Sequence, residues 1–180
     1  MAGAGVSTVR ASGIPQNSEI SRHLAGAHLC DAFAVSLSGR SRSALEIYLA
    51  IAAQTPAWID WLMTVRNRAG ALFGLKPLRL LGDIDSGKTP SSYRVGDRVG
   101  IFSILYLSED EVVLLEADKH LEAKVSLLRR DDANGASAVM TTVIRVHNLL
   151  GRAYMLPVWP VHKLMVPAQL ARLVLASHAR

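Results

Sequence analysis

The chain has 180 residues, half of them hydrophobic, and a formal net charge of +5. A chain of this length forms one domain with a substantial core, and its apolar content argues against disorder. The positive charges are scattered, and the densest groups are only pairs, such as Arg40/Arg42 and Arg129/Arg130. The sequence therefore does not predict a nucleic-acid interface.

Cys30 is the single cysteine, which excludes an internal disulfide and a cysteine-based zinc site. Its neighbours, Leu29 and Asp31 among them, predict a buried structural thiol. The first 20 residues lack the apolar core of a signal peptide, and no apolar run reaches the roughly 18 residues of a membrane span. We therefore expect a cytoplasmic protein without a membrane span and without a cofactor.

The first half of the chain predicts a tail, a strand and two helices. Residues 1–25 are rich in Gly, Ser and Ala and predict a flexible N-terminal tail ahead of a single domain over residues 26–180. Residues 29–37 alternate as a half-buried strand. Ser43 and Glu46 form the capping-box pattern of a helix over 44–53.

A second helix is expected to begin at Pro56 and to run to Phe73, with Gly74 as the C′ glycine that closes it. Its large apolar residues recur at spacings of three and four, which predicts that they form a buried stripe. The stripe comprises Trp58, Trp61, Leu62, Val65, Ala69 and Leu72. Trp61 is therefore expected in the core or in the lining of a cavity.

The second half of the chain predicts an antiparallel meander. After an irregular segment over 76–97, short turns separate expected strands at 98–107, 111–117, 121–127 and 139–147. An Asn-Gly hairpin loop is expected within 131–135. A proline-marked segment, 157–160, precedes an expected C-terminal helix over 161–177, and Pro167 must either kink this helix or open its final part. The fold class is therefore α+β.

Residues 82–89 (GDIDSGKT) match the phosphate-binding P-loop pattern through Gly82, Gly87, Lys88 and Thr89. That loop must follow a strand and open a long helix whose amides hold the phosphates. The residues after Thr89 have no apolar helical period. We interpret the match as a coincidence and expect no nucleotide site.

Several segments in order resemble a bacterial family of unknown function, DUF2867. They are 55–58 (TPAW), 66–67 (RN), 73–76 (FGLK), 96–102 (GDRVGIF), 111–114 (EVVL), 118–121 (DKHL), 146–148 (VHN), 151–154 (GRAY) and 157–163 (PVWPVHK). The similarity spans about residues 31–172. Val161 and Glu122 depart from the family pattern, which tends to an aromatic residue and an Asp there.

This resemblance implies the helix-grip (START-like, SRPBCC) superfamily. There a curved antiparallel sheet wraps a long C-terminal helix, and two short helices follow the first strand. Such proteins commonly enclose an apolar cavity. Some bind lipids or hydrophobic metabolites, and some catalyse cyclisations, so fold-level analogy alone does not choose between these functions.

The candidate site residues are polar groups near expected turns and helix starts. Asp118 stands two residues before His120, so its carboxylate could orient the imidazole or could instead form an Asx-turn. The other candidates are His147, Asn148, Arg152, Tyr154 and His162. The histidines lack a metal-ligand spacing, so no metal site is expected.

A cavity is expected between the sheet and the C-terminal helix. Alternate residues of two strands form its apolar face: Leu121, Ala123, Val125, Leu127, Met140, Ile144 and Val146. The helix would cover it with Leu164, Leu170, Leu173 and Val174, and the small Ala123 would leave room for a ligand. We expect a module that binds a small hydrophobic molecule. The alternatives are an enzyme of cyclase, dehydratase or hydrolase type in the same cavity, or a protein-interaction domain.

Overall fold

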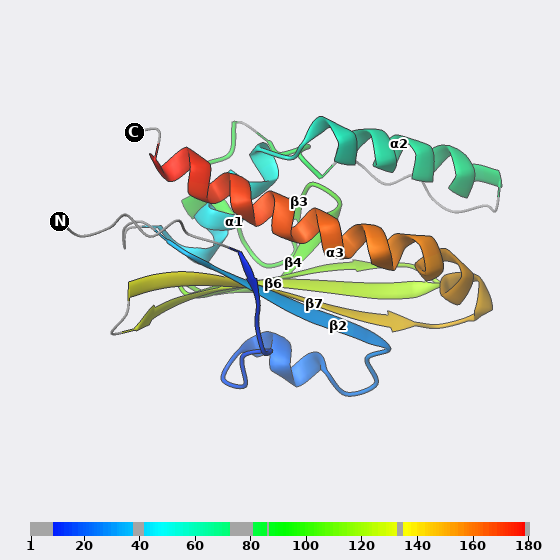
Figure 1. Cartoon of the computed structure of the whole chain (residues 1–180), viewed down its shortest axis with the longest axis horizontal. Helices are drawn as coiled ribbons and strands as arrows, with labels where there is room; N and C mark the ends of the chain where they lie inside the picture. Colours follow the sequence, from blue (N-terminus) through cyan, green and yellow to red (C-terminus); the bar gives the residue numbers. More distant parts are fainter. Residues whose placement is uncertain (1–8, 38–41, 73–80, 86, 133–134, 179–180) are drawn as a thin grey trace.

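The computed structural model describes residues 9–37, 42–72, 81–85, 87–132 and 135–178 (Figure 1). Its strands are β1 (Arg10–Ala11), β2 (Leu29–Ser36), β3 (Arg98–Val99), β4 (Phe102–Leu107), β5 (Glu111–Ala117), β6 (Leu121–Asp132) and β7 (Gly135–Val146). Its helices are α1 (Ala44–Ala53), α2 (Ala57–Leu72) and α3 (Leu149–His178), with short 3-10 helices η1 (Glu19–His23) and η2 (Pro90–Ser92). Phe73 and Gly74, the expected end of the second helix and its C′ glycine, lie outside the described residues.

The described strands form one sheet in the order β1-β2-β7-β6-β5-β4-β3, and every neighbouring pair is antiparallel. Strands β4 to β7 are the expected meander. The expected strand over 98–107 is divided into β3 and β4 because Gly100, with a φ of 57°, turns the chain back on itself. The hairpin between β6 and β7 is tighter than expected, since Asp132 pairs with Gly135.

The α+β prediction is confirmed, and α1 has the predicted bounds. The Ser43 hydroxyl accepts from the Glu46 amide at 3.3 Å, and the Glu46 carboxylate accepts from the Ser43 amide at 2.7 Å. This capping box satisfies two of the amides that the first turn of a helix leaves without intrahelical partners.

The C-terminal helix is longer than the sequence suggests. The expected start of this helix at residue 161 was wrong, because α3 runs unbroken from Leu149 and contains Pro157, Pro160 and Pro167. Each internal proline costs about 3 kcal/mol or more. A continuous apolar face packed on the sheet outweighs this cost, and its residues Met155, Val166, Leu170 and Leu173 are all buried. Leu164, expected on that face, is 71% exposed, and the side chain of Val174 lies outside the described part.

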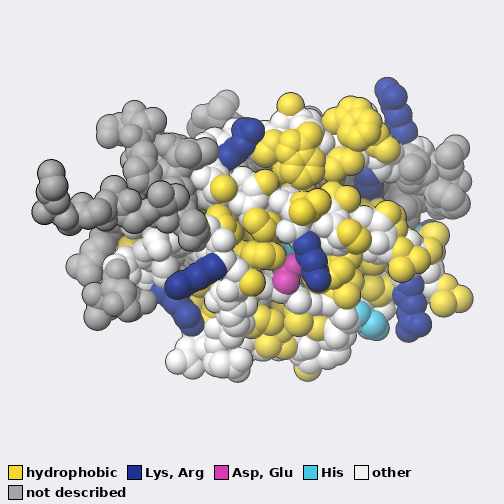
Figure 2. All heavy atoms as spheres, in the orientation of Figure 1, with side chains coloured by type: hydrophobic (Ala, Val, Ile, Leu, Met, Phe, Trp, Pro, Cys, Tyr) yellow, Lys and Arg dark blue, Asp and Glu magenta, His cyan; other side chains and the backbone are white. Residues whose placement is uncertain are grey.

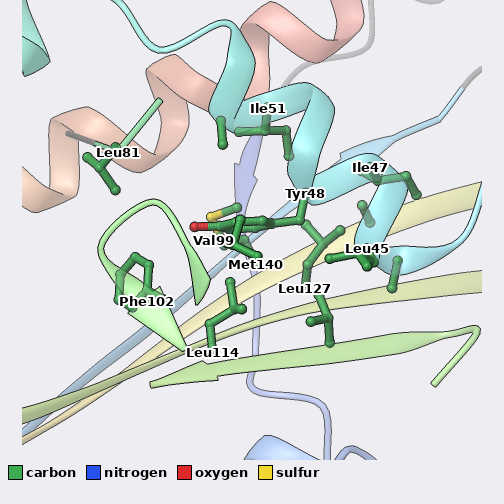
Figure 3. Close-up of a cluster of buried hydrophobic side chains, with 14 of the residues drawn as sticks. Leu45, Ile47, Tyr48, Ile51, Leu81, Val99, Phe102, Leu114, Leu127 and Met140 are labelled. Carbon is green, nitrogen blue, oxygen red and sulfur yellow. The ribbon is translucent and has the colours of Figure 1, made fainter. Parts of the chain in front are cut away.

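The main core lies between one face of the sheet and the helices α1 and α3 (Figure 1). Tyr48 reaches from α1 toward Met140 of β7, with Leu114 and Leu127 below it on the sheet (Figure 3). We call this the inner face of the sheet. Burial of large apolar side chains here, Ile47 and Ile51 included, supplies the main stabilisation of the fold.

The outer face of the sheet is covered by the N-terminal segment. Ile20 of η1 is fully buried against Val113 and Val143. The Glu111 carboxylate accepts from the amides of Glu19 and Ile20 at 2.6 and 3.2 Å and thereby fixes the start of η1. The expectation of a flexible tail was therefore wrong for residues 9–25, because they cover an apolar sheet face. Residues 1–8 lie outside the described part.

The orientation of α2 also differs from the prediction. Trp58 is 41% and Trp61 is 64% exposed, whereas Ile59 is buried. Hydrophobic side chains gather over α2 and α3 on the face shown in Figure 2. The expected buried tryptophan stripe was wrong, because α2 turns Ile59, Met63 and Arg66 toward the protein instead.

The thiol of Cys30 is exposed, so the expected buried position was wrong. Cys30 lies on the outer face of β2, where alternation places even-numbered residues. Beyond β2 the short β1 pairs only with Phe33 and Ala34, which leaves this end of the strand uncovered on that side.

Candidate functional site

A cavity of about 180 Å³ lies between the inner face of the sheet and α3. Residues of α1 and α2 complete its wall, Tyr48 and Met63 among them. Its lining is mainly apolar, with a few polar side chains. An interior space of this character is the usual form of a small-molecule site.

The floor of the cavity is the end of β6 nearest to α3's first turns. Leu121, Ala123 and Val125 line it and are only half-buried, whereas Leu127, farther along the same face, is fully buried. Ala123 pairs with Glu116 on one side and Ile144 on the other. Its methyl group is the smallest side chain in this row, so it leaves open space between two larger neighbours.

The roof is the inward face of α3. Met155, Val158, His162 and Val166 line the cavity at spacings of three and four residues, the period of one helix face. Tyr154, a site residue predicted from the sequence, also lines the cavity. Five of the candidate residues thus line one cavity: Asp118 and His120 from the turn between β5 and β6, Ala123 from β6, and Tyr154 and His162 from α3.

His162 belongs to a polar cluster that the sequence did not reveal. Its Nε2 lies 3.4 Å from Oδ1 of Asp31 on β2, and its ring stacks on Trp159 with centroids 5.3 Å apart. Asp31 pairs in register with Thr142 of β7, which lines the cavity. Oδ2 of Asp31 and Oγ1 of Thr142 are buried and have no hydrogen-bond partner among the described residues.

A second polar cluster joins α2, β5 and α3. Nε of Arg66 donates to the Tyr154 hydroxyl at 3.4 Å, and the guanidinium lies over the Tyr154 ring, 5.6 Å from its centroid. Burial raises the pKa of the Glu116 carboxyl, and the nearby Arg98 guanidinium, 3.5 Å away, partly opposes this. Glu116 and Arg66 are further cavity residues that the sequence analysis missed.

Asp118 takes the Asx-turn role rather than orienting the imidazole. Its Oδ1 accepts from the amides of His120 and Leu121 at 2.7 and 2.9 Å. The His120 ring instead contacts the side chain of Asn148, with Nδ1 3.0 Å from the amide nitrogen. The other ring nitrogen, Nε2, is buried without a partner among the described residues. Both Asp118 and His120 line the cavity.

Asn148 ties the start of α3 to the turn between β5 and β6. Its Oδ1 accepts from the Gly151 amide at 3.0 Å, and its Nδ2 donates to the Lys119 carbonyl at 3.0 Å. Gly151 fits here because a Cβ would lie 2.8 Å from Cγ1 of Val146. This explains why a glycine stands in the first turn of the helix.

The other candidates are not brought to the cavity. His147 and Arg152 are exposed, and Trp61 lies on the outer side of α2. One feature of the sequence could have indicated the site residues that the sequence analysis missed. Asp31, Glu116 and Thr142 are polar residues at positions whose alternation demands an inward, apolar residue.

The segment over 82–89 does not have the surroundings of a phosphate-binding loop. After Thr89 the chain forms η2, a 3-10 helix of three residues, and not a long α-helix. The Lys88 ammonium contacts the Asp97 carboxylate at 2.7 Å and lies over the Tyr93 ring. This contact lowers the pKa of the Asp97 carboxyl, with help from the Arg94 amide.

Searches for other kinds of site in the described part of the chain gave two findings. No three His, Cys, Asp or Glu side chains of that part gather closely enough to hold a metal ion. None of its helices is both long and apolar enough to cross a membrane.

An antiparallel sheet that packs a long C-terminal helix over an apolar cavity defines an α+β protein with an interior ligand-sized space. The chain belongs to the family described as "Protein of unknown function (DUF2867)", whose sequence model matches residues 23–169. The resemblance noted from the sequence is thereby confirmed. No curated protein and no solved structure shows significant similarity to the chain.

Proposed function

We propose that this protein binds a small hydrophobic molecule in the cavity between the sheet and α3. The observation that carries the proposal is the space itself, about 180 Å³ with a mainly apolar lining. An apolar cavity of about 150 Å³ stays dry and accepts a benzene-sized guest. The cavity here is therefore large enough for one aromatic ring or a short aliphatic chain.

We also propose that the fold is a helix-grip fold. The order of elements supports this, since α1 and α2 follow β2, a meander follows them, and α3 closes the chain. In such an arrangement the long helix lies across the sheet and cannot fill the whole concave side, which favours a cavity.

The binding role is preferred to an enzymatic one because of Asp118. A carboxylate that oriented the His120 imidazole would have indicated acid–base chemistry. The Asp118 carboxylate instead accepts backbone amides, which is a structural task. Side chains also do not fill the space between the sheet and α3, whereas a domain that only binds other proteins would need no such cavity.

The test is a titration of the purified protein with toluene, followed by ligand-observed NMR and calorimetry. We expect saturable binding of one molecule per chain. Ala123→Phe should fill the space beside Glu116 and Ile144 and abolish binding, while Ala123→Val should weaken it less. Both variants must keep a cooperative thermal transition. Absence of saturation in the unmodified protein, or unchanged binding in a folded Ala123→Phe variant, would overturn the proposal.

A further inference from the structure

We propose that the ligand of this cavity is a neutral molecule that carries a hydroxyl group, and that Asp31 and Thr142 bind this hydroxyl. The inference rests on the proposed function and names the ligand class for the same site. It arises from two buried oxygen atoms on residues that pair in register on the inner face of the sheet.

The first oxygen is Oγ1 of Thr142. This residue lines the cavity and is only 2% exposed, yet its hydroxyl has no hydrogen-bond partner among the described residues. Buried hydroxyls are almost always hydrogen-bonded, because burial without a partner is costly. An isolated one on a cavity wall marks a place where a guest could supply the partner.

The second oxygen is Oδ2 of Asp31, which is also buried and unpartnered among the described residues. Asp31 is the register partner of Thr142, so the two side chains are neighbours on one face. His162 contacts only the other carboxylate oxygen, at 3.4 Å, and Trp159 stacks on the His162 ring. The carboxylate is therefore held in place beside the lining residue Thr142, while Oδ2 has no partner among the described residues.

The chemistry of these two groups selects a hydroxyl. An ionised carboxylate only accepts hydrogen bonds, whereas a threonine hydroxyl can donate or accept. A ligand hydroxyl can donate to Asp31 and accept from Thr142 at the same time. A ligand carboxylate can donate to neither group, so this part of the cavity disfavours the carboxylate of a fatty acid.

The size of the cavity limits the rest of the molecule. A space of about 180 Å³ holds a single ring or a chain of similar bulk in addition to the hydroxyl. The apolar residues of the floor and roof, such as Val125 and Val158, would contact that part. A one-ring phenol is the simplest molecule with both features.

The experiment compares toluene with 4-methylphenol, which differ only by the hydroxyl, by calorimetry and ligand-observed NMR on the full chain. We expect 4-methylphenol to bind about tenfold more tightly, the effect of one hydrogen bond to a charged group. Benzylammonium and 4-methylbenzoate serve as charged comparisons, and both should bind more weakly than 4-methylphenol, because transfer of a charge into a mainly apolar cavity is costly.

Thr142→Val removes the hydroxyl at constant shape and should abolish the preference for 4-methylphenol. It should also raise the thermal midpoint, because an unpartnered buried hydroxyl is lost. Thr141→Val is the matched control. Thr141 is equally buried and its hydroxyl is equally unpartnered among the described residues, but it lies on the opposite face of the sheet. This control should gain stability and keep the preference. Asp31→Asn should also reduce the preference, so the test does not depend on one variant.

Toluene binding without any preference for 4-methylphenol would overturn this inference and leave the proposed function standing. Failure of both molecules to bind would overturn both. Tighter binding of 4-methylbenzoate or benzylammonium would overturn the hydroxyl assignment. Equal loss of preference in Thr141→Val and Thr142→Val would remove Thr142 from the site.

Discussion

The side-chain amide of Asn148 lies 3.0 Å from Nδ1 of His120. Through this contact the residue that caps α3 also positions a ring on the cavity wall. The same amide reaches the Lys119 carbonyl, so one side chain joins the roof of the cavity to the turn at the end of its floor.

Asn148→Ala should lower the free energy of unfolding by about 0.5–2 kcal/mol, the usual range for the loss of an N-cap side chain. Asn148→Asp keeps an oxygen for the Gly151 amide but loses the donor to the Lys119 carbonyl, so its loss should be smaller. Chemical denaturation measures both. An Asn148→Ala variant as stable as the parent would contradict the capping role.

Glu116→Gln should stabilise the ligand-free protein at neutral pH. Burial raises the pKa of the Glu116 carboxyl in the folded state, so the folded protein binds its proton more strongly than the unfolded chain does. Stability therefore falls as pH rises from the unfolded pKa through the folded pKa, and the penalty is complete above that range. Gln cannot ionise and escapes this penalty.

Thermal midpoints of Glu116→Gln and the parent, measured from pH 4 to pH 8, check this expectation. The two curves should converge at the acidic end, where the carboxyl is protonated in both states, and should separate as pH rises. If the separation instead grew toward acid, the carboxyl would have a lowered pKa in the folded protein.

Trp61→Ala should change the free energy of unfolding by less than about 0.5 kcal/mol, because the side chain is 64% exposed. Ile59→Ala, two residues away on the same helix, should cost about 2–5 kcal/mol, since Ile59 is 1% exposed. Denaturation of the two variants in parallel decides which side of α2 faces the protein. The opposite order would restore the stripe expected from the sequence.

Lys88→Ala should change the titration of a carboxyl and not the binding of a nucleotide. Calorimetry with ATP and magnesium should show no binding by the parent or the variant, since η2 is too short to supply the amides of a phosphate site. The pKa of the Asp97 carboxyl, followed by NMR, should rise toward its ordinary value once the Lys88 contact is lost. Micromolar ATP binding that Lys88→Ala abolished would contradict this assignment.

The sequence by itself determined the features that depend on neighbouring residues. The capping box of Ser43 and Glu46 and the alternation of residues 121–127 are local patterns, and α1 and the meander follow them closely. Both rest on short-range hydrogen bonding and on the period of a strand, which do not need the rest of the chain. The segments that resemble the family could also be recognised in their order, and the family's sequence model matches residues 23–169.

Only the tertiary structure decided which side of each element faces inward and which polar groups meet. The tryptophans that belong to the apolar stripe of α2 face the solvent. They do so because the helix turns Met63 toward the cavity and Arg66 toward Tyr154. His162 and Asp31 are 131 residues apart in the chain. Their contact exists because β2 pairs with β7 and α3 then crosses that pair, and no local pattern encodes a crossing between elements so distant in sequence.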